Sequence, residues 1–151
     1  MNADRAVYLD SSAIVKLAVA EPESAALRRY LRRRRPLVTS AIARTEVARA
    51  LLPLGPVAVR RGLDALSRLE LIRVSDRILA DAGALLPAEL RSLDAIHLAT
   101  MQHLGASLVR VVTYDQRMSM AAVAIGLPAH APSRSVSAGA PPSISVSGSW
   151  S

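Results

Sequence analysis

The fold of this chain can be argued outward from one stretch near its start, Ala6-Val7-Tyr8-Leu9-Asp10-Ser11-Ser12-Ala13. The run from Ala6 to Leu9 is apolar and ends at Asp10, and beyond it apolar residues recur with helical spacing at Ile14, Leu17 and Ala18. We therefore predict that a short strand passes directly into a helix, with Asp10 at the junction.

The same alternation of short apolar runs and amphipathic segments continues along the chain. Further strands are predicted at residues 37–39, 71–74, 108–113 and 128–130. Helices are predicted at residues 23–33, 40–52, 56–69, 76–86 and 94–103, and a last one follows Asp115 and ends near Gly126. This order is typical of an α/β protein, a three-layer α/β/α sandwich with a central, mainly parallel sheet.

Composition limits the size and the chemistry of the protein. The 151 residues suit one domain, and with 51% hydrophobic residues, 3% aromatics and no phenylalanine its core must be aliphatic. Cysteine is absent, which excludes disulfides, thiolate zinc sites and a cysteine nucleophile. No secretory signal or membrane span can be drawn, so we expect a cytoplasmic protein.

The character of the sequence changes at Pro132. Residues 1–131 carry the strand and helix pattern, whereas residues 132–151 are dominated by Ser, Pro, Gly and Ala. Such a segment buries too little apolar surface to offset the entropy of ordering it. We predict a folded domain over 1–131 and a disordered tail over 132–151.

Positive charge on this chain is almost entirely arginine. The formal net charge is +7, and Lys16 is the single lysine among 19 basic residues. Arginine forks match phosphates, so Arg28, Arg29 and residues 32–35 could line a path for an RNA backbone, although a solvated helix end explains them equally well. Only Tyr30 and Tyr114 are candidates for stacking on RNA bases.

Four of the 12 acidic residues stand out by their positions. Asp10 and Asp115 each follow a predicted strand, Asp94 begins a predicted helix, and Glu46 shares a helical face with apolar residues. Taken singly, each aspartate could be a helix N-cap, and Glu46 could pair with Arg49 one turn later.

Taken together, the four carboxylates favour a different interpretation. Carboxylates that converge at the carboxyl ends of parallel strands repel one another unless a hard cation compensates them. Magnesium, with manganese as a close substitute, prefers such oxygen ligands and retains bound water. Hydrolysis of a phosphodiester is the chemistry that this combination fits.

Four segments resemble the successive acidic motifs of VapC-like PIN-domain ribonucleases. They are Tyr8-Leu9-Asp10-Ser11-Ser12-Ala13, Thr45-Glu46-Val47, Leu93-Asp94-Ala95-Ile96-His97-Leu98-Ala99 and Val112-Thr113-Tyr114-Asp115. The resemblance covers residues 6–129. It implies a PIN-like α/β/α fold and Mg²⁺- or Mn²⁺-dependent endonucleolytic cleavage of RNA. It also implies a toxin neutralised by a small VapB-like antitoxin, and a homodimer.

The resemblance also implies roles for individual residues. Asp10 and Asp94 would be metal ligands, with Glu46 and Asp115 completing the acidic, catalytic pocket directly or through water. Supporting roles would fall to three hydroxyl residues: Ser11, Ser12 and Thr113. Some relatives carry another acidic or amide residue just after the last aspartate, where this chain has Gln116 and Arg117, and Arg117 could hold a phosphate instead.

Three further interpretations concern the role of His97, a non-catalytic domain and a phosphatase. His97, one turn beyond Asp94, is left out of the catalytic set because a histidine on an apolar helix is more often structural. A non-catalytic PIN-like module that binds RNA or protein would use the same acids only as caps. A phosphatase with Asp10 as nucleophile would need a suitably placed lysine, and Lys16 is the only lysine available.

Overall fold

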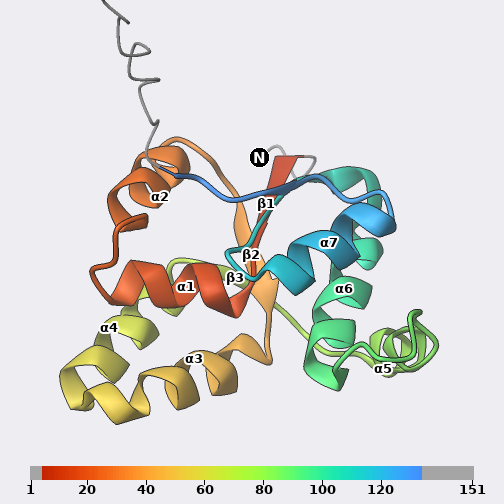
Figure 1. The fold of residues 1–151 in the computed structure, drawn as a ribbon, viewed down its shortest axis with the longest axis horizontal. Helices are drawn as coiled ribbons and strands as arrows, with labels where there is room; N and C mark the ends of the chain where they lie inside the picture. Colours follow the sequence, from red (N-terminus) through yellow and green to blue (C-terminus); the bar gives the residue numbers. More distant parts are fainter. Residues whose placement is uncertain (1–4, 134–151) are drawn as a thin grey trace, which may run out of the picture.

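Five parallel strands form the centre of the fold in the order β3-β2-β1-β4-β5 (Figure 1). The computed structural model describes residues 5–133, so the tail predicted at 132–151 lies almost wholly outside the described residues. The strands are β1 (Ala6–Leu9), β2 (Leu37–Ser40), β3 (Glu70–Ile72), β4 (Leu108–Val112) and β5 (Ala129–His130).

Helices cover both faces of this sheet. One side carries α1 (Ser11–Ala18), α2 (Ser24–Leu31), α3 (Ala43–Leu51) and α4 (Pro56–Ser67), and the other carries α5 (Asp76–Gly83), α6 (Ser92–Leu104) and α7 (Gln116–Ala124) (Figure 1). Two short 3₁₀ turns, η2 (Leu52–Leu54) and η3 (Gly105–Ser107), complete the described elements. The predicted three-layer sandwich is confirmed.

The central strand β1 is a continuous apolar run because both of its faces are buried. Val7 and Leu9 of β1 pack with residues of α1 to α4, whereas Ala6 and Tyr8 pack with residues of α6 and α7. A strand between two helix layers has no solvent face on which polar residues would alternate. The aliphatic composition therefore fills a core on each face of the sheet, and a third cluster lies between α5 and α6.

The strand order reverses direction between β1 and β4, which are neighbours in the sheet. From β1 the chain proceeds outward through β2 to β3, and from β4 it proceeds to β5 on the other side. Leu9 lies opposite Val112 in this pair, and the Asp10 amide donates to the Val112 carbonyl at 3.2 Å. In open parallel sheets, sites form at the carboxyl ends of strands where the order reverses.

Several element boundaries differ from the sequence prediction. Ser40 ends β2 instead of capping α3; its hydroxyl accepts from the Ile42 amide at 3.3 Å, in a turn that precedes the helix. Helix α6 begins at Ser92, so Asp94 lies within its first turn and is not an N-cap. Within residues 5–133, no helix has both the length and the apolar character needed to cross a membrane.

Candidate active site

Asp10 lies at the carboxyl end of β1 and is enclosed by hydrogen-bond donors. Its Oδ1 accepts from Ser12 Oγ at 2.6 Å and from the Ala13 amide at 3.1 Å, which also makes Asp10 the N-cap of α1. Its Oδ2 accepts from Thr113 Oγ1 at 2.5 Å. Burial raises the pKa of Asp10, and the hydrogen bonds from Ser12 and Thr113 oppose that rise. These contacts hold the carboxylate in one orientation.

Glu46, in the first turn of α3, joins the same edge of the sheet. Its Oε1 accepts from Ser11 Oγ at 2.9 Å and lies 2.6 Å from Nε2 of His97. Arg49, which could have paired with Glu46 one turn later, is not its partner; the ion-pair partner of Glu46 among the described residues is His97. Glu46 is therefore attached to both helix layers, through α1 and through α6.

His97 continues this contact into the core. The side chain is 1% exposed, and its Nδ1 lies 2.5 Å from the hydroxyl of Tyr8, which in turn accepts from the Ser40 amide at 3.2 Å. Burial raises the pKa of Tyr8, so the phenol stays neutral and its proton is available to Nδ1. The remaining ring proton of a neutral His97 then lies on Nε2 and points to Glu46.

Asp94 and Asp115 complete the acidic group from the first turn of α6 and the start of α7. Burial raises the pKa of Asp94, and the nearby charges of Asp115 and Glu46 raise it further, opposed by Arg91 and His97. Asp115 caps α7, since its Oδ1 accepts from the amides of Arg117 and Met118 at 2.9 and 3.3 Å. Mutual repulsion of this kind is what a bound cation relieves.

The carboxylate oxygens suit a hard divalent ion. Among residues 5–133, no three His, Asp or Glu side chains come close enough together to enclose one metal ion. Magnesium, however, is usually held by one or two carboxylates together with waters and substrate phosphates. Glu46 Oε2 and Asp115 Oδ2 accept no hydrogen bond from the described residues and are free to act as ligands. Ligation by all four acids remains a prediction.

Most of the supporting residues predicted from sequence have the expected contacts. Ser12 and Thr113 orient Asp10, and Ser11 orients Glu46. Lys16 instead contacts Glu21 and Glu23, which leaves it no role beside Asp10 as a phosphatase would need. The contribution of Tyr8 was missed, because a tyrosine within an apolar strand gives no sign of what its hydroxyl will meet.

Comparison with known proteins agrees with this geometry. A family model described as PIN domain matches residues 7–124. The chain belongs to the PIN-domain family. This PIN domain is VapC-like: it is 62% identical over 128 residues to Ribonuclease VapC46 of Mycobacterium tuberculosis (strain ATCC 25618 / H37Rv), which covers 85% of this chain and 98% of that relative.

Two further proteins are similar to this chain at lower sequence identity. Ribonuclease VapC35 of Mycobacterium tuberculosis (strain CDC 1551 / Oshkosh) is 42% identical over 130 residues, covering 83% of this chain and 96% of its own length. The crystal structure of Mycobacterium tuberculosis VapC20, a toxin that cleaves the sarcin-ricin loop, matches with a TM-score of 0.62 at 18% identity, over 76% of this chain and 94% of that one. At that identity, the match to VapC20 supports the PIN fold alone.

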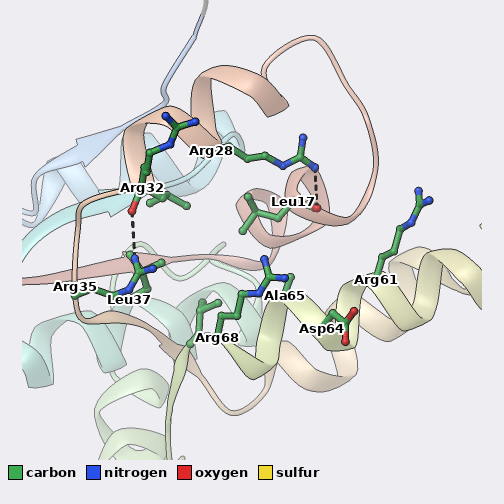
Figure 2. A pocket seen from close by; sticks show the side chains of 11 residues that line it. Leu17, Arg28, Arg32, Arg35, Leu37, Arg61, Asp64, Ala65 and Arg68 are labelled. Carbon is green, nitrogen blue, oxygen red and sulfur yellow. Dashed lines mark hydrogen bonds between the residues drawn. The ribbon is translucent and has the colours of Figure 1, made fainter.

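A second surface of the PIN domain gathers arginines around an apolar floor. A hollow of about 480 Å³ lies between α1, α2 and α4, with Leu17, Leu31 and Leu37 among its apolar lining (Figure 2). Five arginines surround it: Arg28, Arg32, Arg35, Arg61 and Arg68. Asp64 is the single carboxylate in this lining, and none of the five arginines forms an ion pair within residues 5–133.

The arginine run at residues 32–35 lies away from the acidic site. Arg35 immediately precedes the strand Leu37–Ser40, and Arg33, Arg34 and Arg35 line another hollow together with Arg5, which precedes Ala6–Leu9. These residues therefore lie at the amino ends of the strands, opposite the edge that carries Asp10. Tyr30 packs on His130 with ring centroids 4.9 Å apart and lies beneath Arg34, and the Tyr114 hydroxyl donates to the Pro132 carbonyl.

Proposed function

We propose that this PIN domain is a Mg²⁺-dependent endoribonuclease and the toxin of a VapBC-like toxin-antitoxin pair. The observation that carries the proposal is the group formed by Asp10, Glu46, Asp94 and Asp115 where the strand order reverses, in a chain 62% identical to a ribonuclease of the VapC group. A half-buried carboxyl group such as Asp94, whose pKa is raised by burial and by the nearby charges of Asp115 and Glu46, is a costly arrangement for a purely structural site.

The proposed reaction is hydrolysis of an RNA phosphodiester, in which water forms a new bond to phosphorus and the bond to one ribose oxygen breaks. Bound Mg²⁺, or Mn²⁺ in its place, would favour ionisation of the water and stabilise negative charge at phosphorus. Asp10 and Asp94 would be its protein ligands, with Glu46 and Asp115 completing the pocket directly or through water. One ionised carboxylate accepts the proton of the attacking water, and the departing oxygen takes a proton from solvent.

The test compares Asp94→Asn with Asp81→Asn, a matched change at an exposed carboxylate on α5. Cellular RNA is collected after brief expression of each variant and of the wild type, and its 5′ ends are mapped. We expect new ends with the wild type and Asp81→Asn and none with Asp94→Asn. Identical ends for all three proteins would exclude a catalytic role for this site and favour the alternative, a non-catalytic RNA- or protein-binding module.

The arginine-rimmed hollow supports the proposal of an antitoxin partner. Five guanidinium groups around one carboxylate would attract an acidic segment, and the leucines between α1, α2 and α4 would accept its apolar face. A polyanion without apolar side chains, such as an RNA backbone, would make no use of that floor (Figure 2). We therefore assign this hollow to an acidic amphipathic segment of a small VapB-like protein.

This assignment is tested with Arg61→Glu/Arg68→Glu, using Arg60→Glu on the same helix, outside the hollow, as the control. Each protein is co-expressed with the small protein encoded beside it, and the complex is measured by affinity capture and light scattering. We expect the double variant to lose the complex while the control retains it. Light scattering of the toxin alone also tests the predicted homodimer.

A further inference from the structure

An apolar hollow lies directly beside the acidic site, between the start of α6 and the exposed side of α7. Its volume is about 340 Å³, and Asp94 forms part of its wall. Six of its lining residues are apolar: Pro87, Leu90, Met118, Met120, Ala121 and Ala124. A hollow of this size is within the range of small-molecule sites and can accept one nucleobase.

Met120 is a large, exposed apolar side chain in the lining of this hollow. The side chain is 73% exposed although it is large and apolar, and it stands on the wall that α7 contributes. Methionine adapts its shape to flat, polarisable surfaces, which include the faces of nucleobases. The three tyrosines of the described residues, Tyr8, Tyr30 and Tyr114, are already engaged by other contacts, so no tyrosine competes for this role among them.

The polar rim of the hollow suits the phosphate attached to such a base. Arg117 lies in the first turn of α7, two residues after the Asp115 N-cap, and forms no ion pair among residues 5–133. Arg91 also lines the hollow and lies 3.9 Å from Asp94, and Glu89 is the other carboxylate of the lining. A phosphate beside Asp94 and Asp115 would therefore have two guanidinium groups in the same lining.

We propose that this hollow seats one unstacked nucleobase of the RNA, next to the phosphodiester that is cleaved, with Arg117 contacting the phosphate. The inference rests on the proposed ribonuclease function and adds to it a binding site for one base beside the cleaved bond. Only a base that is turned out of a helix can enter the hollow.

The test uses Met120→Gln and Ala124→Tyr, which remove the apolar wall and fill the hollow, respectively. Val123→Thr is the matched control, because Val123 is 61% exposed on the same helix but does not line the hollow. A hairpin RNA that the wild type cleaves is prepared intact and with a single abasic nucleotide at each position around the cut. Cleavage is measured as kcat/KM.

We expect both hollow variants to lose on the order of tenfold in kcat/KM on intact RNA, and the control to match the wild type. One abasic position should lower wild-type cleavage by a similar factor and add little to the loss in Ala124→Tyr. Equal cleavage by all variants, or losses that add at every abasic position, would overturn the proposal. A change of oligomeric state in Met120→Gln would also overturn the proposal, because the hollow would then be part of an interface with a second copy of the chain.

A binding measurement separates this inference from the function on which it rests. Fluorescence anisotropy of the intact and abasic RNAs with Asp94→Asn requires no cleavage. If the wild type cleaves no RNA, the same measurement is made on a hairpin RNA that the protein binds, and weaker binding of one abasic form would still support the base site while the nuclease proposal fails. Equal binding of intact and abasic RNAs by Asp94→Asn would overturn the base site even if the wild type cleaves.

Discussion

His97 connects the buried core of the protein to the acidic site through two side-chain contacts. It bridges Tyr8, on the central strand, and Glu46, on the opposite helix layer, by contacts of 2.5 and 2.6 Å. Both partners are buried or half-buried, so removing the imidazole would leave the Tyr8 hydroxyl proton without its acceptor and Glu46 with one donor fewer. A buried partner that orients a ligand acts on metal affinity without touching the metal.

His97→Ala is accordingly expected to lower the free energy of unfolding by about 2–4 kcal/mol and to weaken Mn²⁺ binding by roughly 10- to 100-fold. His97→Gln, which can still donate to Glu46, should recover part of the Mn²⁺ affinity. Urea unfolding and titration calorimetry with Mn²⁺ measure the two effects. If Mn²⁺ affinity falls equally in both variants, His97 does not act by orienting Glu46.

Asp94 should destabilise the metal-free protein at neutral pH. Its pKa is raised by burial and by Asp115, so its contribution to stability is full below the ordinary pKa of an aspartate and is lost as the pH rises through the raised value. Asp94→Asn should therefore raise the melting temperature of the metal-free protein at pH 7. This gain in melting temperature should vanish at a pH below the ordinary aspartate pKa. Added Mg²⁺ should raise the melting temperature of the wild type only. A lower melting temperature for Asp94→Asn at pH 7 would show that the charge is already compensated.

At the scale of elements, helices α3 and α4 are brought together by a glycine. A Cβ on Gly62 would lie 2.5 Å from Leu51 Cδ1 and 3.0 Å from Val47 Cγ1, and both of those side chains are buried. This close packing supports the first turn of α3, which carries Glu46. Gly83, at the end of α5, has no neighbour within 4 Å of such a Cβ.

The two glycines predict opposite outcomes for one substitution. Gly62→Ala should lower the free energy of unfolding by about 1–3 kcal/mol because the new methyl group overpacks the α3–α4 contact. Gly83→Ala should raise it by about 0.5–1 kcal/mol, because alanine restricts the unfolded chain and favours a helix. Chemical denaturation of both variants is the measurement. Stabilisation by both would mean that Leu51 moves aside without cost.

At the scale of the whole molecule, positive charge lies on two opposite edges of the sheet. The formal net charge is +7, and arginines occur both beside the acidic site and at the amino ends of the strands. RNA affinity should fall as salt rises, since each phosphate contact releases counterions. If RNA binds along the acidic edge, only arginines of that edge contribute to the salt dependence.

Arg117→Gln should therefore reduce the slope of log affinity against log salt by about 0.7–0.9, the amount expected for one phosphate contact. Arg33→Gln, at the opposite edge, should leave the slope unchanged. Binding of a hairpin RNA to Asp94→Asn at several salt concentrations measures both slopes. A larger effect from Arg33→Gln would instead indicate that the RNA backbone binds along the arginine run at residues 32–35.

Local sequence was enough to predict the layers of the fold and to place two of the acidic residues at the ends of strands. Strands such as Ala6–Leu9 are short apolar runs, and Asp10 and Asp115 follow strands at positions where a helix must begin. These features depend on neighbours along the chain, whose spacing is visible in the sequence. The supporting roles of Ser12 and Thr113 followed from the resemblance to VapC-like PIN domains, and both hydroxyl groups donate to Asp10.

Only the tertiary structure decided which distant residues meet. The contact between Tyr8 and His97 joins positions 89 apart, and the arginine rim combines residues of α2 and α4 that no local pattern relates. The same holds for the arginine run at residues 32–35, whose place opposite the acids follows from the direction of β2 in the sheet. Strand order and helix packing set these contacts, and both arise from burial of the whole chain rather than from any single segment.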